Sequence, residues 1–171
     1  MIYTIQNEFL TVRVEDLGAQ LSSIQAPDGT EYLWQGDPDI WARRAPILFP
    51  FIARLRENTY CLDGQPYAIS THGFARDMVF SLVDQGEDYI SLQLTDTPET
   101  RKVYPFSFSL TVTYTLEGNR LKKCHRVENR SDKDMYYELG AHDGFRAPVE
   151  PGVPMSSWSI RLPGVERVQF Y

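Results

Sequence analysis

Two of the three histidines lie in short runs in which a glycine and an aromatic residue stand close to the imidazole. His72 opens the run HGFARD, and His142 lies within GAHDGF. The ordinary pKa of histidine is near neutral pH, and a neighbouring glycine leaves the ring open to a small molecule. These two imidazoles therefore predict proton transfer to a small bound molecule. The third, His125, lies in the run KKCHR and is predicted to be a surface or strand-edge residue.

The composition is that of a globular protein with one substantial core. The chain has 171 residues, of which 42% are hydrophobic and 23% charged, and we expect a single domain over residues 1–171. The net charge of −6 and the shortness of each basic run argue against a nucleic-acid surface.

We expect no membrane-spanning segment and no leader peptide in this sequence. Its longest apolar run is interrupted by Pro46 and Pro50 and is too short to span a bilayer. We therefore expect a cytoplasmic protein that binds no membrane. Cys61 and Cys124 are expected to be reduced thiols in core strands.

Alternation of apolar and polar residues with a period of two dominates the elements that must position these histidines. Between Phe106 and Leu116 every second residue is apolar and the others are serine or threonine, which predicts a long strand with one buried face. The turn at residues 117–119 then leads into a second run over 121–127, so a hairpin is expected. Shorter strand-like runs cover residues 9–14, 20–25, 31–33, 60–62, 67–69, 78–83 and 89–94. The pattern predicts an all-β, antiparallel β-sandwich or barrel.

The segment from Trp41 to Asn58 departs from this alternation. It is apolar, rich in arginine and broken by Pro46 and Pro50, which lack the N–H that a central strand needs. We expect a long ordered loop packed on the sandwich. Loops on rigid β scaffolds commonly carry binding sites.

Four stretches of the chain resemble the aldose 1-epimerase (galactose mutarotase) family. They are GAQLSSIQAPDGTEYLWQGDPDIW (18–41), PILFPFIARLRENTY (46–60), HGFARDMVF (72–80) and GAHDGFRAPVEPG (140–152). The resemblance implies a galactose mutarotase-like supersandwich. It also implies an isomerase of carbohydrate metabolism that interconverts the α and β anomers of a free hexose, with no cofactor and no metal.

The resemblance also implies roles for individual residues. His142 matches the general acid that protonates the ring oxygen, His72 a histidine that binds the sugar near that oxygen, and Arg54 an arginine that contacts sugar hydroxyls. Beside the histidines, Phe74 and Phe145 are predicted to stack on the sugar. Arg76 is predicted either to bind substrate or to tie its turn to backbone carbonyls. The subgroup commonly has proline where this chain has Asp143, and often has glutamine where it has Thr71.

The family's catalytic base is a glutamate that lies beyond Tyr171, because its chains are nearly twice this long. We therefore expect an incomplete sandwich that lacks the C-terminal part of the fold and holds only the acid half of the site. Glu138 lies roughly 13 Å along an extended strand from His142, which is too far to share one hemiacetal. Asp143 is expected to act on His142 through its charge, and Asp77 to pair with an arginine.

Two other functions compete with the epimerase. One is a non-catalytic carbohydrate-binding β-sandwich. The other is a relative of hexose-phosphate epimerases, in which guanidinium groups would hold a phosphate; they are Arg43, Arg44, Arg54, Arg56 and Arg76. In every case a monosaccharide is the expected partner. Exposed sheet edges would also allow a homo-oligomer to form.

Overall fold

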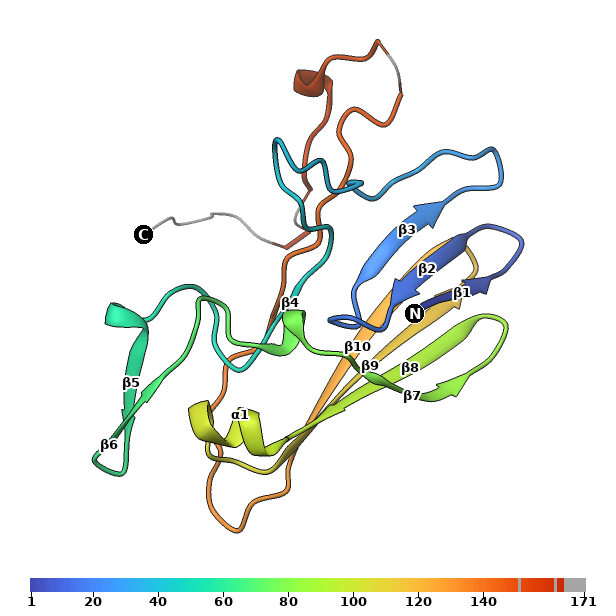
Figure 1. Cartoon of the computed structure of the whole chain (residues 1–171). Coiled ribbons are helices and arrows are strands. Elements are labelled where there is room, and N and C mark those ends of the chain that lie inside the picture. Colours follow the sequence, from blue (N-terminus) through green and yellow to red (C-terminus); the bar gives the residue numbers. More distant parts are fainter. Residues whose placement is uncertain (151, 162, 165–171) are drawn as a thin grey trace.

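The computed structural model describes residues 1–150, 152–161, 163 and 164. Two antiparallel sheets form its main body (Figure 1). The first has the order β1 (Ile2–Gln6), β2 (Thr11–Glu15), β3 (Leu21–Gln25). The second has the order β10 (Arg120–Asn129), β9 (Phe108–Glu117), β8 (Tyr89–Thr95), β7 (Ser81–Gln85).

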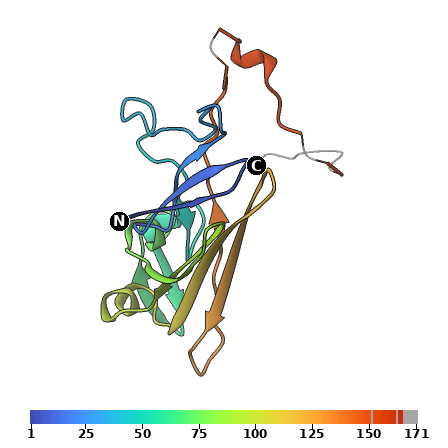
Figure 2. The same cartoon turned by 90° about the vertical axis from the view of Figure 1, so that its right-hand side faces the viewer.

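Two smaller strand pairs and a few short helices complete the described structure. The pairs are β4 (Ile47–Leu48) with β11 (Gly140–Ala141), and β5 (Thr59–Leu62) with β6 (Gln65–Ala68). The helices are α1 (Pro98–Val103) and the 3-10 turns η1 (Arg56–Asn58), η2 (Ala75–Asp77) and η3 (Met155–Ser157). The described residues between 147 and 158 extend away from both sheets in the two views (Figures 1 and 2).

The apolar faces of the two main sheets share one core. Val12 and Leu21 of the first sheet belong to the same buried cluster as Leu92 and Val112 of the second. The fully buried Tyr114 of β9 donates a hydrogen bond from its hydroxyl to the carbonyl of Ala19, 2.8 Å away. This burial raises the Tyr114 pKa well above 10. The predicted antiparallel β-sandwich is confirmed.

The predicted long hairpin is also confirmed. β9 and β10 pair without a break from Glu117↔Arg120 to Phe108↔Asn129, and alternate residues of β9 from Phe108 to Leu116 are buried. β10 is an outer strand of its sheet and carries His125, whose ring is half-buried. The expectation that the two cysteines lie in the core is wrong. Cys61 and Cys124 are free and exposed, because they fall on the outward faces of β5 and β10.

Two elements did not appear in the sequence pattern. β1 has only one fully buried residue, Ile5, so alternation along it is weak. α1 is six residues long and too short to show a helical stripe. Its signal is instead local, a capping box formed by Thr97 and Thr100 with proline at the start of the helix. Residues 31–33, predicted as a strand, form only isolated bridges to other segments.

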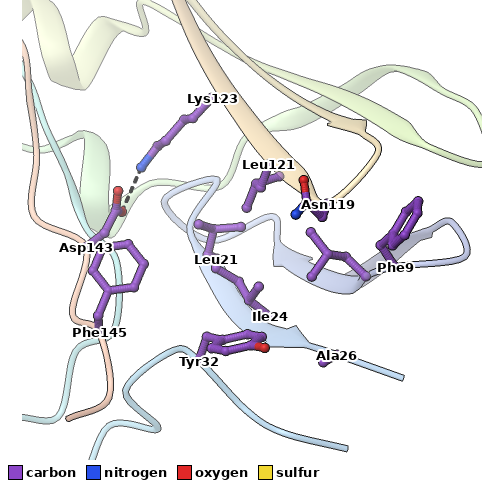
Figure 3. A pocket seen from close by; sticks show the side chains of 11 residues that line it. Phe9, Leu21, Ile24, Ala26, Tyr32, Asn119, Leu121, Lys123, Asp143 and Phe145 are labelled. Carbon is purple, nitrogen blue, oxygen red and sulfur yellow. Dashed lines mark hydrogen bonds and ion pairs between the residues drawn. The ribbon is translucent and has the colours of Figure 1, made fainter. Parts of the chain in front are cut away.

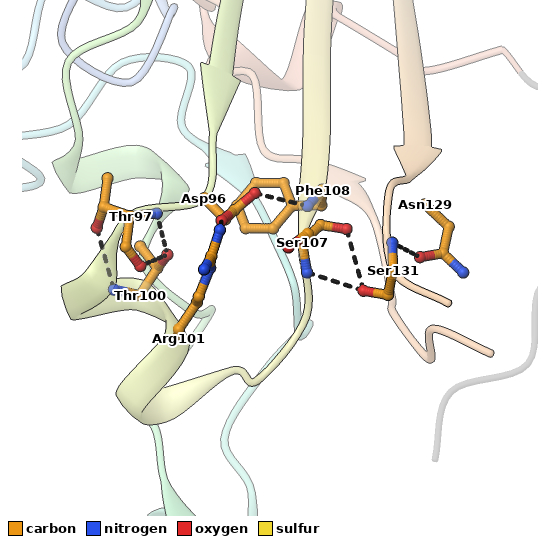
Figure 4. A network of polar contacts seen from close by, with 8 residues as sticks. All are labelled: Asp96, Thr97, Thr100, Arg101, Ser107, Phe108, Asn129 and Ser131. Atoms are coloured by element: carbon orange, nitrogen blue, oxygen red, sulfur yellow. Dashed lines mark hydrogen bonds and ion pairs between the residues drawn. The ribbon is translucent and has the colours of Figure 1, made fainter. Parts of the chain in front are cut away.

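A polar network joins α1 to the adjacent end of the large sheet (Figure 4). The Asp96 carboxylate accepts a hydrogen bond from the backbone N–H of Phe108 at 3.0 Å and forms an ion pair with Arg101 of α1. On the other side, the Ser131 hydroxyl accepts from the N–H of Ser107 at 2.8 Å. These contacts fix where β9 begins.

The segment between residues 41 and 58 is an ordered loop, as predicted, with the two-residue strand β4 at its centre. Ala45, Ile47 and Phe49 are fully buried. β4 pairs with β11, so the loop lies against the chain around residues 138–142. None of the helices in the described ranges combines the length and apolar character needed to cross a bilayer.

Candidate functional site

Backbone contacts hold the chain around His142 against the central loop. Ala141 pairs with Ile47, and the N–H of His142 donates to the carbonyl of Pro46 at 3.1 Å. Further along the same pairing, the N–H of Glu138 donates to the carbonyl of Pro50. The Glu138 carboxylate accepts from the N–H of Ile52 at 2.7 Å. His142 is therefore placed by the loop, over 90 residues earlier in the chain.

The same loop holds His72 through a reciprocal pair of hydrogen bonds with Ala53. The N–H of His72 donates to the Ala53 carbonyl, and the N–H of Ala53 donates to the His72 Nδ1, both at 2.9 Å. His72 and Ala53 both have left-handed backbone angles, with φ of 67° and 60°. Such angles cost about 1–3 kcal/mol each in non-glycine residues. The two hydrogen bonds hold His72 and Ala53 in these strained backbone conformations.

The environment of His72 favours the neutral form of its imidazole. Its pKa is lowered first by burial and then by the positive charges of Arg76, His142 and Arg43. Because Nδ1 accepts a hydrogen bond, the proton of the neutral ring lies on Nε2. His72 is thus suited to donate a hydrogen bond to a ligand oxygen.

His142 is exposed, and its ring is placed differently. Within the described residues no hydrogen bond holds the imidazole. Its ring instead packs against the indole of Trp41, with ring centroids 5.1 Å apart and planes inclined by 35°. Both ring nitrogens remain available to a ligand.

Asp77 pairs with two arginines beside His72, so its predicted pairing is confirmed. Its carboxylate lies 2.8 Å from Nη2 of Arg43 and 3.5 Å from Nε of Arg76. Arg76 also donates to the carbonyl of Thr71 at 2.7 Å, which is the predicted tie between the turn and a backbone carbonyl. Substrate binding by Arg76, whose side chain is 17% exposed, stays a prediction.

The other proposed sugar-binding residues lie in three different settings. Arg54 directly follows Ala53, is exposed, and donates from Nε to the Asn58 side chain at 3.2 Å. Phe74 is half-buried and packs on the core aromatic Phe108, with centroids 6.0 Å apart, so the core occupies much of its ring. Phe145 is 67% exposed. The sugar contacts of all three stay predictions.

Phe145 lines a largely apolar cavity of about 480 Å³ between the two main sheets (Figure 3). The neighbouring Asp143 also lines this cavity, and its carboxylate is held by Lys123 at 2.9 Å. The Asp143 carboxylate is therefore paired with Lys123 of β10. The expectation that its charge acts on His142 is replaced by this ion pair.

The sequence did not predict that Trp41 and Arg43 contribute to the site. Trp41 was named only as the start of the loop, and Arg43 only as a possible phosphate ligand. Both lie in the unusual loop over residues 41–58, and that loop was the available signal.

Comparison with known proteins gives a consistent result. The sequence model of the aldose 1-epimerase family matches residues 1–164. The chain is 37% identical over 172 aligned residues to the chromosomal protein LacX of Lactococcus lactis subsp. lactis, covering 97% of this chain and 58% of that protein.

Solved structures resemble the fold closely. A galactose mutarotase related enzyme from Lactobacillus acidophilus superposes with a TM-score of 0.88 at 39% identity, over 90% of this chain and 52% of that one. A galactose mutarotase-like protein from Lactobacillus casei gives a TM-score of 0.83 at 36% identity, over 85% and 50%. The chain thus spans little more than half the length of these relatives. It has their galactose mutarotase-like sandwich fold and belongs to the aldose 1-epimerase family.

Proposed function

We propose that the site formed by His72 and His142 binds a free hexose and exchanges its α and β anomers. The observation that carries this proposal is the attachment of both histidines to the loop over residues 41–58. His72 is bonded through Nδ1 to Ala53, whereas His142 is bonded only through its backbone N–H to Pro46 within the described residues. Family membership supports it.

The exchange requires a proton donor, a proton acceptor and one free rotation. His142 donates a proton to the ring oxygen as the bond from that oxygen to the anomeric carbon breaks, while a base removes the proton of the anomeric hydroxyl. The resulting aldehyde rotates about one bond and recloses with the roles reversed. His72 donates from Nε2 to a sugar oxygen and holds the ring in place during these steps.

We propose that the base comes from outside the residues that the structure describes. Three carboxylates within five residues of the histidines in the sequence are already engaged: Glu138 by the N–H of Ile52, Asp143 by Lys123, and Asp77 by Arg43 and Arg76. On this proposal the chain holds the sugar and the acid, and a carboxylate supplied in solution can take the place of the base.

A polarimetric assay with added carboxylate tests both parts. Freshly dissolved α-D-galactose or α-D-glucose is followed with the 171-residue chain at increasing formate, against chain-free samples of the same formate concentration. We expect the excess rate to rise with formate and to disappear in His142→Ala. An excess rate that His142→Ala leaves unchanged would contradict the assignment of the acid. A large formate-independent rate would contradict the missing base.

A carbohydrate-binding protein without catalysis is the second candidate, and the engagement of all three nearby carboxylates favours it. Titration calorimetry beside polarimetry separates the two functions. Saturable hexose binding with no excess rate at any formate concentration would support the second candidate. The phosphate-binding alternative is less well supported, because Arg43 and Arg76 are held by Asp77 and Arg44 by Glu15.

We also propose that the chain associates with further copies through the outer edge of β10, which no other strand of the described residues covers. This ten-residue strand is outermost in its sheet, and unpaired strand edges are templates for pairing. We expect a dimer or larger species in light scattering, weakened by His125→Pro. The even-numbered residues of this hairpin strand bond to β9, as Arg130 does to Ser107, so the N–H of His125 points to the outer edge and its loss removes a mid-strand donor there. A monodisperse monomer would contradict this proposal.

A further inference from the structure

The indole of Trp41 occupies a defined seat in the loop. The backbone N–H of Trp41 donates to the Asp37 carbonyl at 2.7 Å, and the Trp41 carbonyl accepts from the indole N–H of Trp34 at 2.7 Å. Both bonds fix the backbone of Trp41, so its side chain leaves the loop in one direction.

Gly144 makes room for this side chain. A Cβ at position 144 would lie 2.8 Å from Cζ3 of Trp41 and 3.1 Å from Cβ of Trp34. Real Cβ atoms essentially never approach another atom to 2.8 Å, so any side chain at position 144 would displace the indole of Trp41. Gly144 is itself fixed, because its N–H donates to Arg44 at 2.8 Å and its carbonyl accepts from Trp34 at 2.9 Å.

The indole so placed packs on the imidazole of His142, 5.1 Å away. Within the described residues the imidazole receives no hydrogen bond, whereas His72 has its Nδ1 fixed by Ala53. The backbone ties of His142 set the position of its Cα but leave rotation about its side-chain bonds free. A flat aromatic neighbour limits that rotation.

We propose that Trp41 is a positioning residue for the proposed exchange reaction, acting by orienting the imidazole of His142. This inference rests on the proposed function for its kinetic consequence, but not for the packing itself. A reacting group displaced by about 1 Å can lose roughly a hundredfold in rate, so an aromatic contact of this kind has a measurable effect.

Nuclear magnetic resonance of the 171-residue chain tests the packing without any activity. The carbon-bound ring protons of His142, assigned by their loss in His142→Ala, should show a ring-current shift. That shift should disappear in Trp41→Ala and remain in part in Trp41→Phe, while the His72 resonances stay in place. Trp158→Ala removes an indole of 42% exposure outside the loop and serves as the matched control. Unchanged His142 resonances in Trp41→Ala would overturn the proposal.

The formate-supported rate tests the consequence. Trp41→Ala should lower it by about tenfold to a hundredfold with the hexose affinity within about twofold, and Trp41→Phe should recover most of the loss. A fall in hexose affinity that accounts for the whole loss would overturn the proposal, because Trp41 would then be a sugar-binding residue. If Trp41→Ala does not fold, Gly144→Ala serves instead, because it retains the indole but displaces it. It should cause the same change in the His142 resonances and the same loss of rate.

If the unmodified chain has no formate-supported rate, the proposed function fails, and the resonance measurement alone decides whether Trp41 orients His142.

Discussion

The two histidines of the site are held by different means, although one loop supports both. The turn around His72 is fixed by backbone atoms: its Nδ1 and N–H both bond to Ala53, and Gly73 lies in direct contact with the Phe49 backbone. The ring of His142 is fixed by a side chain, the indole of Trp41. A neutral donor benefits from a rigid setting, whereas a group that exchanges protons with a ligand needs at least one ring nitrogen free to reach it.

The largest expected difference between the two histidines lies in catalysis. His142→Ala should lower the formate-supported rate by about 10²–10⁴-fold, the usual contribution of general acid–base catalysis. His72→Ala removes a hydrogen bond worth about 0.5–1.5 kcal/mol and should lower the rate by roughly tenfold or less. Polarimetry of the two variants measures the difference. Equal losses would show that the two imidazoles do not have separate roles.

The backbone support of His72 predicts a large loss of stability when Gly73 is replaced. A Cβ at position 73 would lie 2.2 Å from the Phe49 carbonyl oxygen, and the residue has a φ of 71°. Gly73→Ala should lower the free energy of unfolding by about 3 kcal/mol or more. Gly64→Ala is the control, because that position has a φ of 78° with open space around it, and should cost only about 1 kcal/mol. Chemical denaturation gives both values, and similar losses would contradict the close backbone contact.

The contact between Glu138 and Ile52 tests how independently the two histidines are held. Glu138→Gln replaces the carboxylate that accepts from Ile52 with a neutral amide, and should lower the free energy of unfolding by about 1 kcal/mol because Glu138 is exposed. Nuclear magnetic resonance of this variant should show larger shifts at His72, whose partner Ala53 directly follows Ile52, than at His142, which lies four residues from Glu138. Shifts of equal size at both rings would show that the loop responds as a single rigid piece.

The smallest effect concerns the charges around His72. Its pKa lies below the ordinary 6.5 because of burial and then the neighbouring positive charges. Its contribution to stability is therefore complete above about pH 6.5 and is lost as the pH falls from there through the lower pKa of the folded state. Asp77→Asn leaves Arg43 and Arg76 without their shared carboxylate and should lower the His72 pKa further. Titration of the His72 ring resonances measures this change, and a higher pKa would contradict it.

The fold could be predicted from the sequence wherever alternation was long. The run from Phe106 to Leu116 faces a core on one side for its whole length, so its pattern specified both the strand and its hairpin with residues 120–129. β1 and α1 escaped notice because one has a single fully buried residue and the other a single cap. The exposed cysteines were misplaced because their residue type is usually buried and the outward face of a short strand is hard to assign.

The site was predictable in its residue types and less so in its contacts. The glycine-flanked histidines stood out by themselves. The packing of Trp41 on His142 joins positions 101 residues apart in the chain, and only the folded loop brings them together. The same holds for Asp143, whose partner Lys123 lies on a strand that the sequence could not place beside it.

The two prolines beside β4 also limit how the strand at His142 can pair. Pro46 and Pro50 have no N–H, and here they serve only as acceptors, for His142 and Glu138 respectively. A shift of the pairing by one residue would turn the His142 side chain to the opposite face. It would also bring a proline to a position where the ladder needs a donor. Misaligned pairing is thus disfavoured at both ends of β4. The spacing of the two prolines therefore determines the direction in which the His142 side chain points.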